Sequence, residues 1–267
     1  MTIGEAARQV DHDQSWLSRI ESLESGIHPN DVRALLNVFG VTGEEAEAVV
    51  SVARQARQRG WWVNYSGVTV ESFSSLVGME SDASAIRTYQ CQTVPGLLQT
   101  EDYARAVIAA SAVRRRPEDI DQNLALRLDR QALLASDDRP QFVAVLDEAV
   151  VRRVIGGRAI MRAQIERLLE VAEQQHIQIQ VLPFDAGAHP GLNGSFLILD
   201  FPPPPGPFPH AADDRVVYTD NSFSCFYMDR PGEVAVYTTA FEQIRAEALS
   251  PDQSRGLLHS ITKDLTM

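Results

Sequence analysis

Residues 2–21 are Thr2-Ile-Gly-Glu-Ala-Ala-Arg-Gln-Val-Asp-His-Asp-Gln-Ser-Trp-Leu-Ser-Arg-Ile-Glu21, and this sequence predicts two short helices joined by a tight turn. Thr2 and Glu5 have the spacing of a capping box, so the first helix can begin almost at the first residue. Asp11 and His12 are then expected to turn the chain.

The second helix is predicted to keep most of its polar side chains on the surface. Asp13 can cap it by accepting hydrogen bonds from the backbone N–H groups of its first turn. Leu17 and Ile20 lie three residues apart and form its buried edge. The remaining side chains are expected to point outward: Gln14, Ser15, Trp16, Ser18 and Arg19.

Two interpretations of this pattern remain open. It is typical of a helix-turn-helix that contacts DNA, but two amphipathic helices on a turn also occur in helical bundles that never meet DNA. Residues 1–60 hold six arginines against nine acidic residues, a net charge of −3. Since non-specific DNA affinity comes largely from neutralising phosphates, this charge disfavours tight binding.

Composition favours a soluble globular protein. The chain has 267 residues, 44% of them hydrophobic, and a net charge of −12, which argues against a protein that coats polyanions. Neither a signal segment nor a long apolar run is evident, so we expect a cytoplasmic protein that does not bind membranes. Cys91 and Cys225 are far apart and are expected to be reduced, with no zinc site.

Helical and strand patterns alternate after residue 60, where Trp61-Trp62 marks a change of composition. Helices are expected near 70–84, 100–112, 117–135, 158–175, 231–248 and 251–265. Strands are expected at 85–90, 142–147, 177–182, 196–201, 215–219 and 224–228.

We therefore predict an α+β protein. A small all-α helix-turn-helix domain over residues 1–65 precedes a larger domain over 66–267, in which helices surround a mixed sheet. The strands at 142–146 and 196–199 are almost entirely apolar, which favours the middle of a sheet covered on both faces. The proline-rich tract 202–209 is expected to be an exposed extended loop, or alternatively a ligand for a proline-binding domain.

Residues with catalytic potential are scattered. His189 lies on the Gly-rich loop 185–194, where a hydrogen-bonded structural role is favoured over that of a base. Asp147 and Glu148, at the end of a strand, could form an acid/base pair but more often cap a helix that follows. Cys91 would be a nucleophile only beside a base. No catalytic residue, metal site or cofactor is assigned, and the chain is not expected to be an enzyme.

Several segments resemble one family over nearly the whole chain: actinobacterial transcription regulators with a Cro/CI-type (XRE-family) helix-turn-helix and a long C-terminal domain. The matching segments are Ser18-Arg-Ile-Glu21, Asp31-Val-Arg-Ala-Leu-Leu36, Ile86-Arg-Thr-Tyr89, Val94-Pro-Gly-Leu-Leu-Gln-Thr-Glu-Asp-Tyr-Ala104, Arg130-Gln-Ala-Leu-Leu134, Leu146-Asp-Glu-Ala-Val150, Gln180-Val-Leu-Pro-Phe184, Ala186-Gly-Ala-His189 and Leu249-Ser-Pro251. The 94–104 block is long and in order, which makes it the most specific of them.

The resemblance implies an antitoxin-like DNA-binding regulator. It places the base-contacting positions at Gln14, Ser15, Trp16, Ser18 and Arg19, on a double-stranded operator bound by a homodimer. The C-terminal domain is then expected to bind a small ligand or a small partner protein encoded nearby.

The sequence also departs from that family. The family's usual first helix ahead of Thr2 is not part of this sequence, so we expect either a misassigned start or a trimmed and weakened DNA-binding part. In addition, Ile3 replaces a polar residue and Asp11 replaces a glycine of the turn. Further departures are Cys91 and Thr93 in place of an apolar pair, Cys225 in place of a small residue, and a longer proline-rich loop.

These departures support an alternative, in which the DNA-binding part is vestigial and the C-terminal domain binds a ligand or catalyses a reaction. Residues 89–99 and 185–194 are expected to meet at one pocket, although 94–98 also fits a buried turn. The pocket residues predicted from the sequence are Tyr89, Cys91, Gln92, Asp147, His189 and Tyr218.

Overall fold

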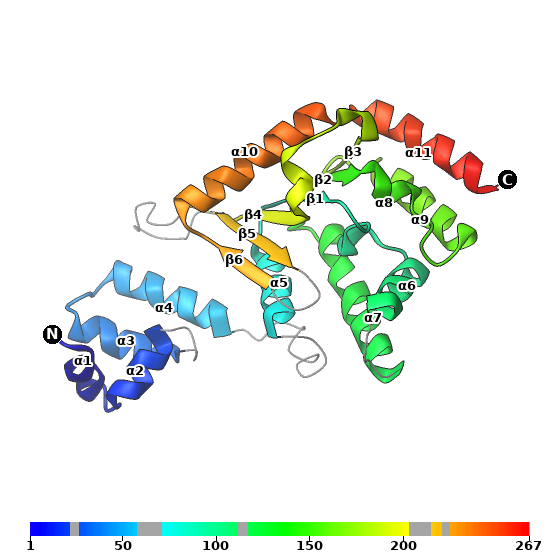
Figure 1. Ribbon diagram of the computed structural model, residues 1–267. Coiled ribbons are helices and arrows are strands. Elements are labelled where there is room, and N and C mark those ends of the chain that lie inside the picture. The colour runs from blue at the N-terminus through cyan, green and yellow to red at the C-terminus, as the bar shows by residue number, and fades with distance from the viewer. Residues whose placement is uncertain (22–26, 58–70, 112–116, 203–214, 221–224, 267) are drawn as a thin grey trace. The chain divides into compact units, whose positions relative to one another are not determined.

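The computed structural model describes residues 1–21, 27–57, 71–111, 117–202, 215–220 and 225–266 (Figure 1). These residues divide into two compact units, one reaching to Arg57 and the other beginning at Glu71. The junction predicted near residues 60–70 lies outside the described residues, and so does most of the proline-rich tract.

Where the structure describes it, the N-terminal unit has four helices, α1 (Ile3–Gln9), α2 (Gln14–Glu21), α3 (Pro29–Val38) and α4 (Glu44–Arg57). The predicted capping box is present, since the Thr2 side chain accepts from the Glu5 N–H and Glu5 accepts from the Thr2 N–H. His28 caps α3, whose first residue is Pro29. Two small apolar clusters join the helices: Ala6, Ala7, Leu17 and Leu35, and Val32, Val50 and Ala53.

The C-terminal unit contains a six-stranded mixed sheet in the part of the chain that the structure describes. Its strands are β1 (Ala85–Gln90), β2 (Gln141–Asp147), β3 (Ile177–Leu182), β4 (Phe196–Asp200), β5 (Arg215–Asp220) and β6 (Cys225–Met228). Their spatial order is β3-β2-β1-β4-β5-β6; β1, β2 and β3 are parallel, and the other neighbouring pairs are antiparallel. The predicted α+β class is confirmed.

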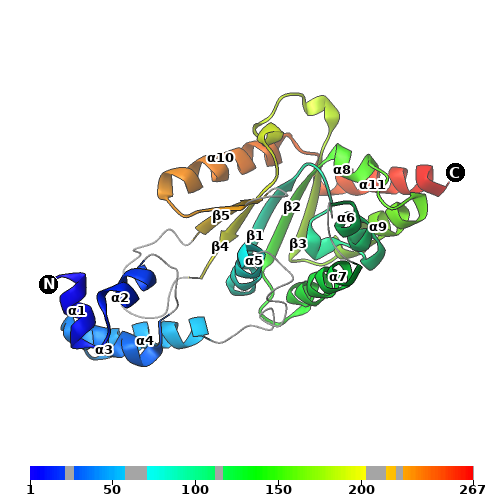
Figure 2. The same cartoon turned by 60° about the horizontal axis from the view of Figure 1, so that its bottom comes forward.

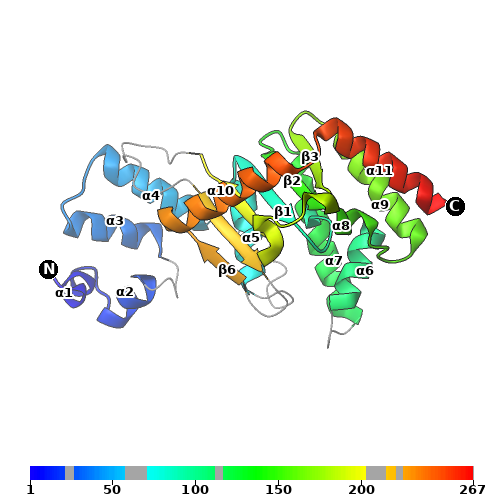
Figure 3. The same ribbon diagram turned by 45° about the horizontal axis from the view of Figure 1, so that its top comes forward.

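Helices cover both faces of this sheet. They are α5 (Glu71–Asp82), α6 (Glu101–Ser111), α7 (Pro117–Gln131), α8 (Glu148–Arg152), α9 (Arg158–Val171), α10 (Pro231–Glu247) and α11 (Pro251–Thr266). One face packs on α10 around Tyr89, Phe196 and Phe241, and Figure 3 shows this helix lying across the strands. The opposite face packs on α6, α9 and α11, which lie together beyond the strands in Figure 2.

The near-continuous apolar strands occupy the predicted positions. β2 lies between β1 and β3, and β4 lies between β1 and β5, so both are interior strands. Alternate residues of each strand belong to opposite clusters, as Val145 and Leu146 show. An apolar side chain is therefore required at nearly every position of β2 and β4, because both faces of these strands are buried.

Candidate functional site

The turn between α1 and α2 is a Schellman motif. The His12 N–H donates to the Ala7 carbonyl at 3.0 Å, and the Asp11 N–H donates to the Arg8 carbonyl at 3.4 Å. Asp11 has φ +60°, the left-handed conformation that this position of the motif requires. The turn predicted at Asp11 and His12 is confirmed, and it sets the direction in which α2 leaves α1.

Asp13 begins α2 as predicted. Its Oδ1 accepts from the Trp16 N–H and from the Ser15 hydroxyl, each at 2.7 Å. These two hydrogen bonds, the Ser15 bond first, lower the pKa of Asp13 below its ordinary value, and the nearby Arg19 contributes. A carboxylate is thus fixed at the first turn of α2.

The two faces of α2 differ in exposure. Leu17 is buried against Ala6, Ala7 and Leu35, while Ile20 is half-buried. The side chains of Gln14, Ser15, Ser18 and Arg19 are exposed, as expected for positions that contact DNA. The Ser15 hydroxyl, however, is already engaged by Asp13.

Trp16 was predicted to point outward, and the structure leaves it partly exposed. It is half-buried, and its ring stacks on His12 with centroids 3.7 Å apart and planes 9° from parallel. His12 Nε2 also lies 3.7 Å from Asp31 Oδ1 on α3. The indole therefore packs α2 onto the turn instead of extending away from it.

In the C-terminal unit, three of the predicted pocket residues meet at the ends of β1 and β2. The Tyr89 hydroxyl donates to Asp147 Oδ2 at 3.4 Å, and His189 Nε2 lies 4.0 Å from the same oxygen. The Tyr89 and His189 rings form an edge contact. Burial, with Asp147 next, raises the pKa of Tyr89 far above its ordinary value.

The loop that carries His189 fills the space above Tyr89. A Cβ placed on Gly191 would lie 2.3 Å from Tyr89 Cε1, so this glycine packs directly on the ring. His189 Nδ1 accepts from the Gly191 N–H at 3.2 Å, and Asp147 Oδ1 accepts from the Ala149 N–H at 2.8 Å, capping α8. Each of these polar groups therefore has a structural partner.

The other three predicted pocket residues are arranged differently, and of these Cys91 packs against the apolar cluster that contains Tyr89. Cys91 contacts Ser195, with Sγ 3.4 Å from the Ser195 hydroxyl. Gln92 is exposed, and among the described residues no hydrogen bond joins it to the others. Tyr218 was placed in the pocket wrongly, because it pairs with Leu197 while Tyr89 pairs with Phe196, which puts the two tyrosines on opposite faces.

The 94–104 block, the most specific part of the family resemblance, forms a buried hydrogen-bonded turn. Gln164 donates to the Leu98 carbonyl and accepts from the Thr100 N–H. Gln99 donates to the Val94 carbonyl, and Gln131 donates to the carbonyls of Gly96 and Gln99. These bonds tie the turn to α7 and α9.

A buried ion pair that was not predicted from the sequence lies beside this turn. Arg130 Nε of α7 lies 3.2 Å from Glu80 Oε2 of α5, and both side chains are almost fully buried. Burial raises the pKa of Glu80, and the Arg130 charge opposes this. No sequence signal separates these residues from ordinary helix-surface charges.

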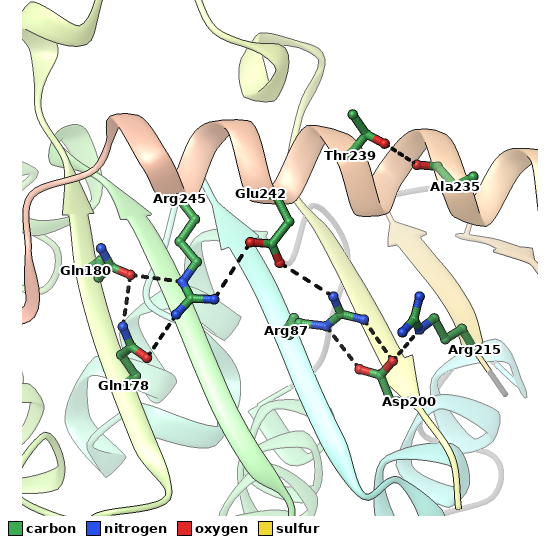
Figure 4. A network of polar contacts seen from close by, with 9 residues as sticks. All are labelled: Arg87, Gln178, Gln180, Asp200, Arg215, Ala235, Thr239, Glu242 and Arg245. Atoms are coloured by element: carbon green, nitrogen blue, oxygen red, sulfur yellow. Dashed lines mark hydrogen bonds and ion pairs between the residues drawn. The ribbon is translucent and has the colours of Figure 1, made fainter. Parts of the chain in front are cut away.

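A second polar network lies between the sheet and α10 (Figure 4). Arg87 on β1 forms a two-point contact with Asp200 on β4, which also accepts from Arg215. Arg245 on α10 donates to Gln178 and Gln180 on β3. The Glu242 carboxylate lies 3.8 Å from the guanidinium groups of both Arg87 and Arg245, so it links the Arg87 group of contacts to the Arg245 group.

Among the residues that the structure describes, no three His, Cys, Asp or Glu side chains gather as they would around a metal ion. Within the same residues, no helix has the length and apolar character needed to cross a membrane.

Comparison with known proteins identifies both parts of the chain. Residues 1–49 match a helix-turn-helix domain, the type of domain found in DNA-binding regulators, and residues 73–260 match a domain of unknown function, DUF5753. No curated protein and no solved structure matches the chain. Because the second match spans well over half of the sequence, the chain belongs to the DUF5753 family.

Proposed function

We propose that this protein is an XRE-type transcription regulator that recognises its operator through α2. The observation that carries this proposal is the α1-turn-α2 geometry, in which Leu17 is buried while Gln14, Ser18 and Arg19 remain exposed on one short helix. The match of residues 1–49 to a helix-turn-helix domain supports it.

The exposed side chains suit contacts with base edges. Glutamine can form paired hydrogen bonds with adenine, and arginine can do so with guanine. Trp16 instead holds α2 against the turn, so its role is to position the helix. A homodimer would contact two half-sites about one helical turn apart, near 34 Å in B-form DNA.

Binding is expected to be modest and to depend only weakly on salt, because few phosphates are neutralised. Residues 1–60 carry a net charge of −3, and the Asp13 carboxylate lies at the first turn of α2. Specificity would then depend on a few base contacts, with little help from general attraction to phosphate.

The test is fluorescence anisotropy at low salt with DNA fragments from the region upstream of the protein's own gene. Arg19→Ala should weaken binding to a specific fragment by about 1–3 kcal/mol if Arg19 contacts a base. Arg162→Ala removes the same charge from an exposed pair with Glu166 on α9 and serves as the matched control. Equal effects of the two substitutions would refute the assignment.

We further propose an antitoxin-like role in the cytoplasm, in which the C-terminal domain binds a small ligand or a nearby-encoded partner protein and is not itself an enzyme. The hydrogen bonds at the β1 and β2 ends support the last point. Asp147 caps α8 and His189 accepts from Gly191, so neither group is poised as a base.

The second candidate is a C-terminal domain with its own ligand-binding or catalytic role and a vestigial DNA-binding part. The juxtaposition of Tyr89, Asp147 and His189, with Cys91 nearby, favours it. Failure of the wild-type protein to bind any upstream fragment at low salt would favour this candidate over the first.

A further inference from the structure

One residue of the helix-turn-helix, His12, contacts three helices of the N-terminal unit. Its N–H donates to the Ala7 carbonyl of α1 at 3.0 Å, and its ring stacks on Trp16 of α2 with centroids 3.7 Å apart. Its Nε2 lies 3.7 Å from Asp31 Oδ1 of α3. Because α1, α2 and α3 all contact this residue, His12 helps to fix the direction of α2 relative to the other two.

Trp16 links His12 to the rest of α2. Its N–H donates to Asp13 Oδ1 at 2.7 Å while its indole lies on His12, so the turn holds both its backbone and its side chain. α2 has eight residues, and Leu17 is the buried one among them. A helix with so little buried surface depends on the stack for its orientation, and the exposed Arg19 on the same helix moves with it.

The charge of the imidazole decides how strongly these contacts hold α2. At 3.7 Å, His12 Nε2 and Asp31 Oδ1 are too far apart for a hydrogen bond, so a neutral ring gains little from the carboxylate. A protonated ring forms an ion pair with Asp31, and the two side chains are only 34% and 32% exposed, so water screens the pair in part. It also forms a cation–π contact with the Trp16 indole, since the centroid separation lies well inside the limit of about 6 Å.

We propose that His12 is a positioning residue for DNA recognition by α2, and that its protonation strengthens DNA binding. A positive imidazole holds α2 more firmly on the turn, so less ordering of the helix accompanies binding. It also adds one positive charge next to α2, in a region whose net charge over residues 1–60 is −3. This role rests on the proposed function, because it acts on DNA through the exposed side chains of α2.

The surroundings of His12 do not oppose a positive charge. The charged residues on the elements that it contacts are Glu5, Arg8, Asp11, Asp13, Arg19, Glu21, Asp31 and Arg33. Among the described residues, Asp31 has the carboxylate that lies within 4 Å of the imidazole. More of these residues are acidic than basic, so the protonated ring is attracted on balance.

Two further groups in the described part of the N-terminal unit belong to classes that change charge near neutral pH, the imidazole of His28 and the α-amino group of Met1. His28 Nδ1 accepts from the Asn30 N–H at the start of α3. A protonated Nδ1 cannot accept, so protonation of His28 weakens this cap. Its effect opposes that of His12 and has to be removed in the experiment.

The experiment measures DNA binding of the full chain by fluorescence anisotropy at constant ionic strength, from about pH 8 to about pH 6. It uses a His28→Asn background, because asparagine is a preferred N-cap residue that does not titrate. We expect binding to tighten by about two- to fivefold over this range. His12→Phe keeps an aromatic ring for the stack but cannot be charged, so it should lack this gain. His259→Phe, at an exposed position on α11, is the matched control and should retain it.

Trp16 fluorescence gives a second readout that does not involve DNA. With Trp61 and Trp62 replaced by phenylalanine, the emission comes from Trp16, and a protonated imidazole in contact with an indole quenches it. We expect the emission of the free protein to fall from about pH 8 to about pH 6, and to stay constant in His12→Phe. If His12→Phe folds poorly, His12→Gln tests the same loss of charge.

The outcomes separate this role from the proposed function. Equal tightening of the parent and of His12→Phe, weaker binding as pH falls, or Trp16 emission that does not change with pH would each overturn the role of His12 and leave DNA recognition by α2 intact. Absence of binding to every upstream fragment at every pH would refute the proposed function, and the role of His12 with it.

Discussion

Asp11 offers a direct test of how the turn of the helix-turn-helix is built. It occupies the position after the α1 cap that glycine commonly takes in a Schellman motif, and its φ is +60°. Its carboxylate also lies at the C-terminal end of α1, where the helix dipole disfavours negative charge. Asp11→Gly should therefore stabilise the N-terminal unit.

The magnitude follows from the backbone. The left-handed conformation costs a residue with a Cβ about 1–2 kcal/mol, and aspartate tolerates it better than most. Removing the Cβ relieves part of this cost and stabilises the folded state. The greater freedom of glycine in the unfolded chain opposes this gain by about 0.5–1 kcal/mol, and removing the negative charge from the end of α1 adds a few tenths of a kcal/mol of stability. We expect Asp11→Gly to gain about 0.5–1 kcal/mol and β-branched Asp11→Val to lose about 1–2 kcal/mol.

Urea unfolding followed by Trp16 fluorescence measures this series, because Trp16 stacks on the neighbouring His12. Trp61 and Trp62 are replaced with phenylalanine so that the signal reports the N-terminal unit. Stability in the order Gly, Asp, Val is expected, and in parallel thermal unfolding the midpoint temperature should move by about 4–8 °C per kcal/mol in a unit of this size. If Asp11→Val is as stable as Asp11→Gly, the left-handed turn is not formed in solution.

Three further predictions concern other features of the two units. Burial raises the pKa of Glu80 above its ordinary value of 4.5, so the folded state binds this proton more tightly than the unfolded state. The free energy of unfolding of the wild type, relative to that of Glu80→Gln, should then fall as pH rises from 4.5 through the folded-state pKa and level off above it. Urea unfolding of both proteins at several pH values measures this difference, and a rise of the difference with pH would contradict the prediction. Gly191→Ala should destabilise the C-terminal unit by about 1–3 kcal/mol in urea unfolding, because the added Cβ would overlap the Tyr89 ring. Gly256→Ala in α11 is the control: its added Cβ would have no atom within 4 Å, so it should stabilise the unit by about 0.5–1 kcal/mol. Asp13→Asn keeps an oxygen that can cap α2 but removes a negative charge, so it should strengthen DNA binding in the anisotropy assay; unchanged affinity would mean that Asp13 lies away from the DNA.

Local patterns were sufficient to predict the strands. The predicted ranges 85–90 and 177–182 coincide with β1 and β3, in which β-branched and aromatic residues are interspersed with polar ones. The short helix α8 was not predicted as an element, although the capping role considered for Asp147 proved to mark its start. Five residues are too few to show helical periodicity.

The face on which a strand residue lies was harder to predict, as Tyr218 shows. Shifting the register by one residue moves a side chain to the opposite face, and the pairing of Tyr218 with Leu197 depends on how β5 lies along β4. In contrast, residues 89–99 and 185–194 were expected to meet because each segment borders a predicted core strand, and the rings of Tyr89 and His189 do form an edge contact. Which segments lie near each other at the ends of the strands follows from the topology of the sheet, whereas the face on which a side chain lies depends on the strand register.

The position of Trp16 has a similar explanation. On the α2 helix alone it falls outside the Leu17 edge, so periodicity places it outward. The turn brings the His12 ring back over α2, and stacking with His12 converts an exposed position into a half-buried one. Helical periodicity cannot include a contact from a residue beyond the helix.

The buried pair of Glu80 and Arg130 shows where sequence patterns stop being informative. Both residues occupy helix positions at which a solvent-exposed charge would be ordinary, and only the packing of α5 against α7 removes them from water. An ion pair of this kind contributes little net stability, since desolvation offsets much of the attraction. Its effect is that any arrangement of α5 that separates the two side chains leaves an unpaired buried charge, so the pair favours one position of α5 on the domain.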